Sequence, residues 1–428
     1  MSDFYTALCA AEKRPPALRN EAQLHELPVQ IKQAQQKSAA FAKILKDVNA
    51  YEVTSRAALA RLPVTRKTEL LDRQKEARSV TATTMSVADI FGGFSSIAYG
   101  ANMPRVFASP GTIYEPEGKA VDYWRSARAL AAAGFKAGDL IHNCFSYHFT
   151  PAGSMMESGA HALGCTVFPA GTGQTEQQVQ AMAELKPAGY VGTPSFLKII
   201  LEKAAEMGVA LPSVTKALVS GEACPPSLRD WFAERGVTAY QCYATADLGL
   251  IAYETSAREG LVIDEGVIVE IVTPGTGDPV AEGEQVRLGA TTCDRYYAPI
   301  RFGTGDLSAV LPGTCPTGRT NTRIKGWMGR ADQTTKIRGM FVHPSQIATI
   351  AKRFPDVVKA RLVVSGEMAD DHMTLQVETS KHAEAEDLLE KISEAIRDVT
   401  KLRGTVSLFA LGSLPNDGKV IEDARSYK

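Results

Sequence analysis

The sequence has few of the features that would place it in a membrane or bind it to nucleic acid. It contains no run of about 18 apolar residues, so it predicts no membrane span. Its 47 Lys and Arg and 48 Asp and Glu residues give a formal net charge of -1, without a basic excess for nucleic acid. The start, MSDFYTALCAAEKRPP, lacks the long apolar core of a secretory signal. We therefore expect a globular protein with a small-molecule partner.

Cysteine chemistry is equally sparse. The seven cysteines are an odd number, and most stand in apolar runs such as HNCF and LGCTVF. Neither a CxxC nor an HExxH pattern occurs, so the sequence gives no support for a zinc site. We interpret these residues as buried free thiols and expect a reducing, cytoplasmic location.

The length of 428 residues exceeds one ordinary core, and the hydrophobic pattern changes along the chain. Residues 1–80 are polar and helical, and KQAQQKSAAFAKILKDV (32–48) predicts an amphipathic helix. From about residue 105, short apolar runs alternate with helical stretches, and TEQQ (175–178) fits a capping box. This rhythm predicts a layered α/β domain with a largely parallel sheet.

The pattern changes again after about residue 260. GLVIDEGVIVEIVTP and EQVRLGATT read as antiparallel strands joined by turns. After GRAD (329–332), two strand patterns, a helical pattern and a last strand predict a small α+β domain. The expected fold is therefore a large α/β domain with additional β structure (1–331) and a small, mobile α+β domain (332–428).

Five stretches could carry chemistry, and each also has an ordinary structural interpretation. A carboxylate in YATAD (243–247) suits Mg²⁺, and Asp306 in RFGTGDLS (301–308) could bind a ribose diol. Equally, these acids could cap helices or form hairpin turns. The other three stretches read alternatively as a turn, a charged hairpin and an exposed lysine; they are SGEACP (220–225), GRADQTTKIRGMFVHP (329–344) and LPNDGKVIEDAR (414–425).

The order and spacing of these stretches resemble the adenylate-forming superfamily of acyl-CoA synthetases, adenylation domains and luciferases. The resemblance is closest to the phenylacetate–CoA ligase branch and extends from about residue 60 to the end. It is carried by LPVTRKTEL (62–70), GTGQTEQQVQAMAELKPAGYVGTPSFL (171–197) and GRADQTTKIRGMFVHPSQI (329–347).

The resemblance implies a two-step reaction. Such enzymes join a carboxylic acid to ATP, giving acyl-AMP and pyrophosphate, and coenzyme A then forms the thioester and releases AMP. By resemblance, Lys419 stabilises the charge of the first step and Asp332 is the hinge between the domains. Lys336 and Arg338 would serve the coenzyme A step. The implied cofactors are ATP, Mg²⁺ and coenzyme A, and relatives are often homodimers.

The resemblance also assigns the substrate-binding residues. Thr245 would act in catalysis as well as in nucleotide binding, and Asp247 stands where the family has a Mg²⁺-binding Glu. Tyr147 and Phe149 would line a pocket for an aryl acid, although both could be plain core. The implied nucleotide-binding residues are Ser109, Gly111, Thr112, Gly221, Glu222, Tyr243, Ala244, Thr245, Asp306 and Arg330.

The chain departs from the branch at the phosphate loop. Where the branch has S-S-G-T-T-G-K-P-T, this chain has ASPGTIYEP (108–116), so Tyr114 and Glu115 replace a glycine and a lysine. An acid beside a triphosphate costs roughly 1 kcal/mol per near contact in water. Gly303 replaces an arginine before TGD, YATAD lacks the glycine and glutamate of YG-x-TE, and Cys315-Pro316-Thr317 keeps one of two cysteines of a metal site in some relatives.

Three hypotheses follow. The first is an ATP-dependent aryl or arylacetic acid–CoA ligase. The second is an adenylating enzyme that passes the acyl group to an amine or a carrier-protein thiol. The third, motivated by Glu115 and Gly303, is a non-catalytic nucleotide or acyl-CoA binding protein.

Overall fold

The computed structural model describes residues 3–79, 90–109, 111–273, 286–292, 299–330, 333–338, 340–367, 370–379 and 385–425. The chain forms two compact units: unit 1 is Met1–Gly221 with Phe232–Met328, and unit 2 is Glu222–Trp231 with Gly329–Lys428. The last segment of unit 1 ends at Met328, and the rest of the chain belongs to unit 2. We expected the boundary between residues 331 and 332, and these two residues lie outside the described ones. No helix in the described residues is long and apolar enough to cross a membrane.

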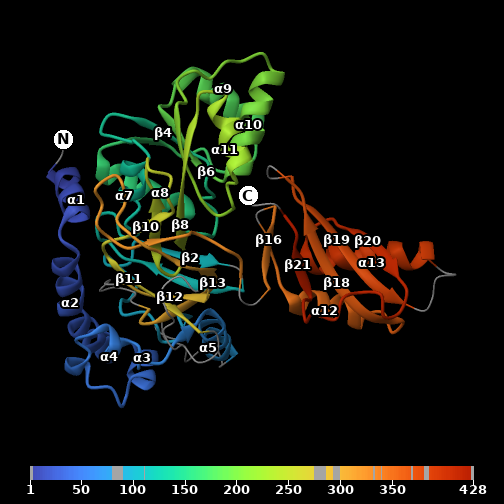
Figure 1. Ribbon diagram of the computed structural model, residues 1–428, viewed down its shortest axis with the longest axis horizontal. Coiled ribbons are helices and arrows are strands. Elements are labelled where there is room, and N and C mark those ends of the chain that lie inside the picture. Colours follow the sequence, from blue (N-terminus) through green and yellow to red (C-terminus); the bar gives the residue numbers. More distant parts are fainter. Residues whose placement is uncertain are drawn as a thin grey trace. The chain divides into compact units, whose positions relative to one another are not determined.

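Helices form the first part of unit 1 (Figure 1). The single helix predicted over 32–48 is wrong: α2 (Pro16–Lys37) ends and α3 (Ala39–Ile44) begins at Ser38. Ser38 has an extended backbone, and its Oγ accepts a hydrogen bond from Phe41 N, as a helix N-cap does. The other elements of this part are α1 (Asp3–Lys13), the 3-10 turn η1 (Ala50–Glu52) and α4 (Arg56–Leu59).

A nine-stranded sheet forms the centre of unit 1, in the order β14-β15-β10-β9-β8-β7-β6-β4-β5. Its predicted parallel part is confirmed and consists of β4 (Leu140–Asn143), β5 (Thr166–Phe168), β6 (Gly189–Gly192), β7 (Lys216–Val219) and β8 (Thr238–Thr245). The rest is antiparallel and consists of β9 (Gly249–Glu254), β10 (Leu261–Ile263), β14 (Val310–Leu311) and β15 (Arg323–Ile324).

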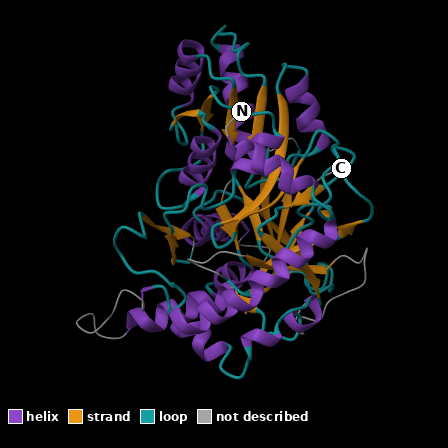
Figure 2. Cartoon of the chain, turned by 90° about the vertical axis from the view of Figure 1, so that its left-hand side faces the viewer, coloured by secondary structure: helices purple, strands orange, loops and turns teal. Residues whose placement is uncertain are grey.

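Helices connect the parallel strands, and Figure 2 shows the strands between helices. They are α7 (Ala127–Ala132) before β4, then α8 (Ala152–Leu163), α9 (Thr175–Leu185), α10 (Pro194–Glu206) and α11 (Pro226–Ala233) between successive strands. The capping box predicted at TEQQ is wrong, because Gln174 precedes α9 and caps nothing with its side chain. Gln178 instead donates Nε2 hydrogen bonds to the carbonyls of Ala170, Gly171 and Gly173.

A second sheet in unit 1 brings the helix that begins at Lys67 next to the strand Phe302–Ser308. Its order is β1-β13-β12-β11, with β1 (Thr65–Arg66), β11 (Val267–Val272), β12 (Val286–Thr292) and β13 (Phe302–Ser308). Because β1 runs parallel to β13, with Arg66 opposite Gly303, α5 (Lys67–Ser79) begins next to β13. A separate hairpin pairs β2 (Arg105–Ser109) with β3 (Ile113–Glu117).

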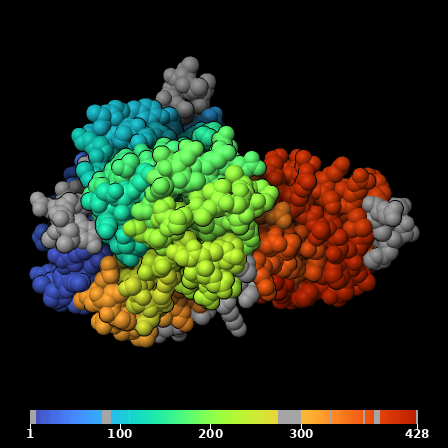
Figure 3. All heavy atoms as spheres, turned by 90° about the horizontal axis from the view of Figure 1, so that it is seen from above, coloured from blue at the N-terminus to red at the C-terminus, as the bar shows by residue number. Residues whose placement is uncertain are grey.

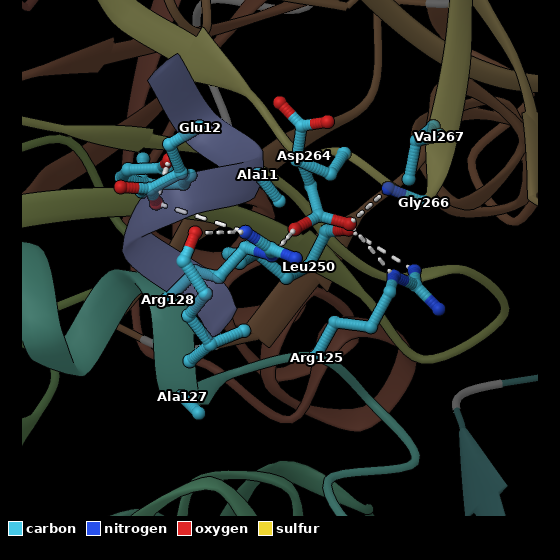
Figure 4. A network of polar contacts seen from close by, with 12 residues as sticks. Ala11, Glu12, Arg125, Ala127, Arg128, Leu250, Asp264, Gly266 and Val267 are labelled. Atoms are coloured by element: carbon cyan, nitrogen blue, oxygen red, sulfur yellow. Dashed lines mark hydrogen bonds and ion pairs between the residues drawn. The ribbon is translucent and has the colours of Figure 1, made fainter. Parts of the chain in front are cut away.

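A buried ion network holds the N-terminal helix in unit 1. Figure 4 shows Asp264 between two arginines, with Arg125 Nε at 3.0 Å and Arg128 Nε at 3.2 Å from its carboxylate oxygens. Arg319 Nε lies 2.9 Å from Glu12 of α1, and on the face seen in Figure 3 the blue N-terminal residues lie beside the orange residues near 320. Buried charges persist only when they are paired in this way.

The part of unit 2 from Gly329 onward forms the predicted small α+β fold. A four-stranded sheet has the order β20-β19-β18-β21 and is joined by two helices and a hairpin. Its strands are β18 (Val357–Ser365), β19 (His372–Thr379), β20 (Thr405–Phe409) and β21 (Ile421–Asp423); the other elements are β16 (Thr335–Ile337), β17 (Met340–Val342), α12 (Pro344–Lys352) and α13 (Ala385–Thr400).

Candidate active site

Asp306 lies on β13 and is held by one side chain from β8 and one from the segment after β15. Tyr243 Oη donates to Asp306 Oδ2 at 2.5 Å, and Trp327 Nε1 donates to Asp306 Oδ1 at 3.2 Å. The carboxylate is buried, and an ionised carboxylate offers about four acceptor positions on its two oxygens. An acid oriented in this way can bind a vicinal diol.

The turn between β8 and β9 is tightly built. Thr245 Oγ1 accepts a hydrogen bond from Leu248 N at 3.1 Å, so the hydroxyl closes the turn. Gly249 has a φ of 68°, and a Cβ there would lie 2.7 Å from the Trp124 carbonyl, so this position requires glycine. Ala244 lies in β8 directly before Thr245, and Asp247 lies buried inside the turn.

The end of β7 is bound to β8. Ser220 Oγ donates to the Cys242 carbonyl at 2.7 Å. Gly221 follows with a φ of 82°, and Glu222 comes directly after it. These residues continue the carboxyl edge of the parallel sheet, where such folds bind ligands.

Lys67 joins two buried carboxylates from distant parts of unit 1. Its Nζ lies 2.9 Å from Asp247 Oδ2 and 3.5 Å from Glu115 Oε1. Ser109 Oγ donates to the same Glu115 oxygen at 2.5 Å. The Glu115 and Asp247 side chains are 0% and 2% exposed, whereas Lys67 is 35% exposed. The sequence did not predict this cluster, although Lys67 is the lysine of LPVTRKTEL.

The cluster shifts the proton affinities of its members. Burial, together with the charge of Asp247, raises the pKa of Glu115 to about 7, although Lys67 and Ser109 oppose the shift. Burial would lower the pKa of Lys67, but attraction to Asp247 and Glu115 outweighs it, so that pKa is raised. Glu115 therefore has internal partners, which the expectation of an acid facing a triphosphate did not include.

The altered loop packs on α5. Gln74 donates Nε2 to the Tyr114 carbonyl at 2.9 Å and accepts from Tyr114 N at 2.8 Å. Arg78 lies over the Tyr114 ring at 5.3 Å and donates to the Thr112 carbonyl at 3.0 Å. Tyr114 thus contributes contacts that the glycine of the branch cannot make. Gly111 and Thr112 remain exposed beside it.

Tyr147 and Phe149 differ in their surroundings. Tyr147 Oη donates to Glu157 Oε2 at 2.7 Å and accepts from Asn143 Nδ2 at 2.8 Å. Burial, together with Glu157, raises the pKa of Tyr147. The Phe149 side chain is 80% exposed at a φ of 63°, while its carbonyl accepts from Ala108 N of β2 at 2.7 Å.

Two further departures have structural counterparts. A Cβ at Gly303 would lie 3.1 Å from Val64 Cγ1, a tight contact that a shift of a few tenths of an ångström in Val64 would have to relieve. Cys315 Sγ lies 3.4 Å from Thr255 Oγ1 and 3.1 Å from Thr317 Oγ1. Burial would raise the pKa of Cys315, but these hydroxyl contacts outweigh it and the pKa is lowered.

Unit 2 places Lys419 in the loop before β21. Gln333 brackets this residue: its Nε2 donates to the Gly418 carbonyl at 3.0 Å, and its Oε1 accepts from Val420 N at 2.7 Å. Asp417 accepts from Lys419 N at 3.0 Å and pairs with Arg361 at 2.7 Å. The loop is therefore fixed on both sides of the lysine.

The other predicted residues of unit 2 lie in and before the β16–β17 hairpin. Lys336 Nζ lies 5.6 Å from the centre of the Phe341 ring. Arg338 has a φ of 47° and donates from Nε and Nη2 to the Asp371 carbonyl. The Arg330 carbonyl accepts from Gln333 N at 3.4 Å, and Asp332 lies outside the described residues.

Comparisons with known proteins assign the family. The family of AMP-binding enzymes matches residues 120–293, and the C-terminal domain of AMP-binding enzymes matches residues 339–423. A phenylacetate-coenzyme A ligase of Thermus thermophilus is 31% identical over 76% of this chain and 72% of its own length. One of Escherichia coli is 30% identical over 74% of this chain and 77% of its own.

Solved structures show the same fold. A 2-hydroxyisobutyryl-CoA ligase in complex with 2-HIB-AMP and CoA superposes with a TM-score of 0.79 at 23% identity, covering 97% of this chain and 92% of that one. The fold agrees with the family matches and with the ligase relatives, which show that the chain belongs to the family of AMP-binding enzymes. Within it, the chain is an AMP-forming acid–CoA ligase and is similar in sequence to the phenylacetate-coenzyme A ligases named above.

Proposed function

We propose that this ligase activates an aryl or arylacetic acid. Adenylation by ATP would give an acyl-AMP and pyrophosphate, and coenzyme A would then take the acyl group and release AMP. The observation that supports the adenylation step is the buried Asp306, which is oriented by Tyr243 and Trp327 and would accept hydrogen bonds from the ribose diol of ATP.

The two units would supply different steps. In unit 1, the turn Tyr243–Thr245 would contact the adenine and the α-phosphate, and Gly221 would lie along the base. Glu222, the first residue of unit 2, would also lie along the base. In unit 2, Lys419 would stabilise the charge of adenylation, because its loop is held by Gln333 and Asp417. Lys336 and Arg338 would serve the thioester step after rotation about Asp332.

Asp247 would hold the Mg²⁺ that accompanies ATP. Its Oδ1 is buried and has no hydrogen-bond partner among the described residues, so a free hard-oxygen ligand is present. Magnesium would neutralise charge on the phosphates, and the described residues hold no group of three or more ligand side chains, which fits a metal completed by phosphate and water.

The acyl site would lie around Tyr147. Its hydrogen bonds to Asn143 and Glu157 fix the ring, and a fixed aromatic ring suits packing against an aryl acid. The six cysteines that the structure describes are free thiols, which is in keeping with the expected cytoplasmic location.

Separate half-reactions test the assignment of Lys419. In Lys419→Ala, acyl-AMP formation should fall about a hundredfold or more, while conversion of supplied acyl-AMP to thioester should be retained. Lys401→Ala, an exposed lysine of the same unit, is the control and should match the wild type. Adenylation at the wild-type rate in Lys419→Ala would remove this role.

A further inference from the structure

Lys67 occupies a position between two carboxylates that have unused oxygens. Asp247 uses Oδ2 and Glu115 uses Oε1 to contact the ammonium group. Asp247 Oδ1 and Glu115 Oε2 are buried and have no hydrogen-bond partner among the described residues. A buried carboxylate oxygen without a hydrogen-bond donor destabilises the folded protein. A cation bound beside these two oxygens would remove this destabilisation.

The charge count supports the same conclusion. Two carboxylates face one ammonium group, so when both acids are ionised the cluster carries a net charge of -1. Serine 109 adds a single hydroxyl donor to the Glu115 oxygen that already faces Lys67. A cation with a charge of +2 would balance the two acids without the lysine.

The geometry suits such an exchange. The two acids cannot move easily, because they are almost fully buried on β3 and in the β8–β9 turn. Lys67 is more than a third exposed and has a flexible stem, so it can leave the cluster toward solvent. The two acids alone do not complete an octahedral site, but magnesium is commonly held by one or two carboxylates together with phosphate and water.

From these contacts we propose that Glu115 and Asp247 form a two-carboxylate site for a divalent cation, and that Lys67 Nζ occupies the position of this cation when the metal is absent. Glu115 thus compensates for the aspartate that stands in place of the longer glutamate. This inference rests on the proposed function for its role in catalysis, but the site can be tested without ATP or acid.

Mn²⁺ binding to the nucleotide-free full chain is the test, measured by electron paramagnetic resonance and titration calorimetry. Glu115→Gln should weaken Mn²⁺ binding about tenfold or more, as loss of a ligand group does. Lys67→Met should strengthen it roughly tenfold, because a competing positive charge is removed. Glu117→Gln is the matched control: Glu117 is on the same strand, is equally buried and pairs with Arg105 instead.

Each outcome decides the proposal. If Glu115→Gln leaves Mn²⁺ affinity unchanged, or if Lys67→Met fails to increase it, the cluster is a structural ion pair and the proposal is wrong. Thermal melting with and without Mn²⁺ provides a second measurement in the wild type and Lys67→Met, should Glu115→Gln fold poorly. Ligase turnover in the same wild-type preparation separates failure of this site from failure of the proposed function.

Discussion

At the scale of residues, the site depends on acids whose partners come from distant parts of the sequence. Asp306 is oriented by Tyr243 of β8 and by Trp327, which precedes the end of unit 1. Hydrogen bonds to a charged group are stronger than neutral ones and fix its direction. These two bonds therefore orient the acid for the ribose diol that we propose it binds.

Asp306→Asn tests the ribose role. The change removes the charge and one acceptor, so the Kd for ATP should rise about tenfold or more, since hydrogen bonds to charged groups contribute about 1.5–3 kcal/mol. Calorimetry of ATP binding is the measurement. Asp139→Asn is the control. Asp139 directly precedes β4 and is similarly buried, but its carboxylate pairs with Lys216. An unchanged Kd in Asp306→Asn would contradict the role.

Sequence motifs identified only part of this site. Tyr243 and Asp306 stand in recognisable stretches, so the resemblance could predict a role for them. Lys67, Trp327 and the internal partners of Glu115 could not be predicted, because their contacts depend on how β1, β3 and the β8–β9 turn meet in three dimensions. The sequence therefore predicted the electrostatic cost of Glu115, but it did not predict the internal partners that offset this cost.

Asp122 gives a pH-dependent prediction. Its carboxylate accepts from Ala127 N at 3.1 Å at the start of α7. Burial raises its pKa from 3.8 to about 7; nearby Asp264 adds to the shift, and Arg125 and the backbone N–H groups of Ala127 and Ser126 oppose it. Since the folded state binds the proton more tightly, this contribution to stability is complete below pH 3.8 and is lost as pH rises through about 7.

Asp122→Asn should remove that pH dependence. Relative to the wild type, the variant should gain unfolding free energy between pH 5 and pH 8, at a slope of at most about 1.4 kcal/mol per pH unit. Urea unfolding at several pH values measures this difference. A difference that stays constant across the range would show that Asp122 is charged in the folded protein at low pH.

At the scale of elements, close backbone approach fixes how α8 packs. A Cβ at Gly159 would lie 2.6 Å from Ala127 N and 2.8 Å from Ser126 Cβ, so glycine lets α8 meet the start of α7. Gly159→Ala should therefore lower the unfolding free energy by about 1–3 kcal/mol. Ser158→Ala on the same helix should change it by no more than about 0.5 kcal/mol. Equal effects in urea melts would disprove the packing argument.

The loop of Lys419 gives a second element-scale prediction. Because Gln333 holds both neighbours of Lys419, Gln333→Ala should reduce acyl-AMP formation while leaving the thioester step from supplied acyl-AMP intact. The expected loss is about tenfold, smaller than for Lys419→Ala, and the double variant should be no worse than Lys419→Ala alone. Stopped-flow pyrophosphate release measures it. Additive losses would indicate that Gln333 acts independently of the lysine.

Local sequence rules were least reliable at the ends of elements. The hydrophobic periodicity predicted the parallel strands and the small domain correctly, because buried faces repeat along the chain. It failed at Ser38, where a side-chain cap interrupts an otherwise continuous helical pattern, and at TEQQ, where Gln178 bonds to the preceding turn instead of completing a cap. Both errors arise from side-chain hydrogen bonds, one at Ser38 and three at Gln178, that the sequence pattern does not specify.

At the scale of the whole molecule, the family resemblance covers both units. The curated relatives match about three quarters of the chain, and a ligase structure covers nearly all of it. Lys419, which we propose acts in adenylation, and Asp306, which we propose binds the ribose, belong to different units, so the proposed cycle requires both units. The altered phosphate loop lies in unit 1 and is packed on α5.

The central claim is that this chain makes an aryl or arylacetic thioester of coenzyme A despite that loop. Its most direct measurement is release of AMP and pyrophosphate from ATP and Mg²⁺ with phenylacetate, benzoates, hydroxybenzoates, indoleacetate or short fatty acids, each with and without coenzyme A. The account predicts coenzyme A-dependent AMP release with an aryl or arylacetic acid. Measurable ATP binding without pyrophosphate release from any of these acids would contradict it.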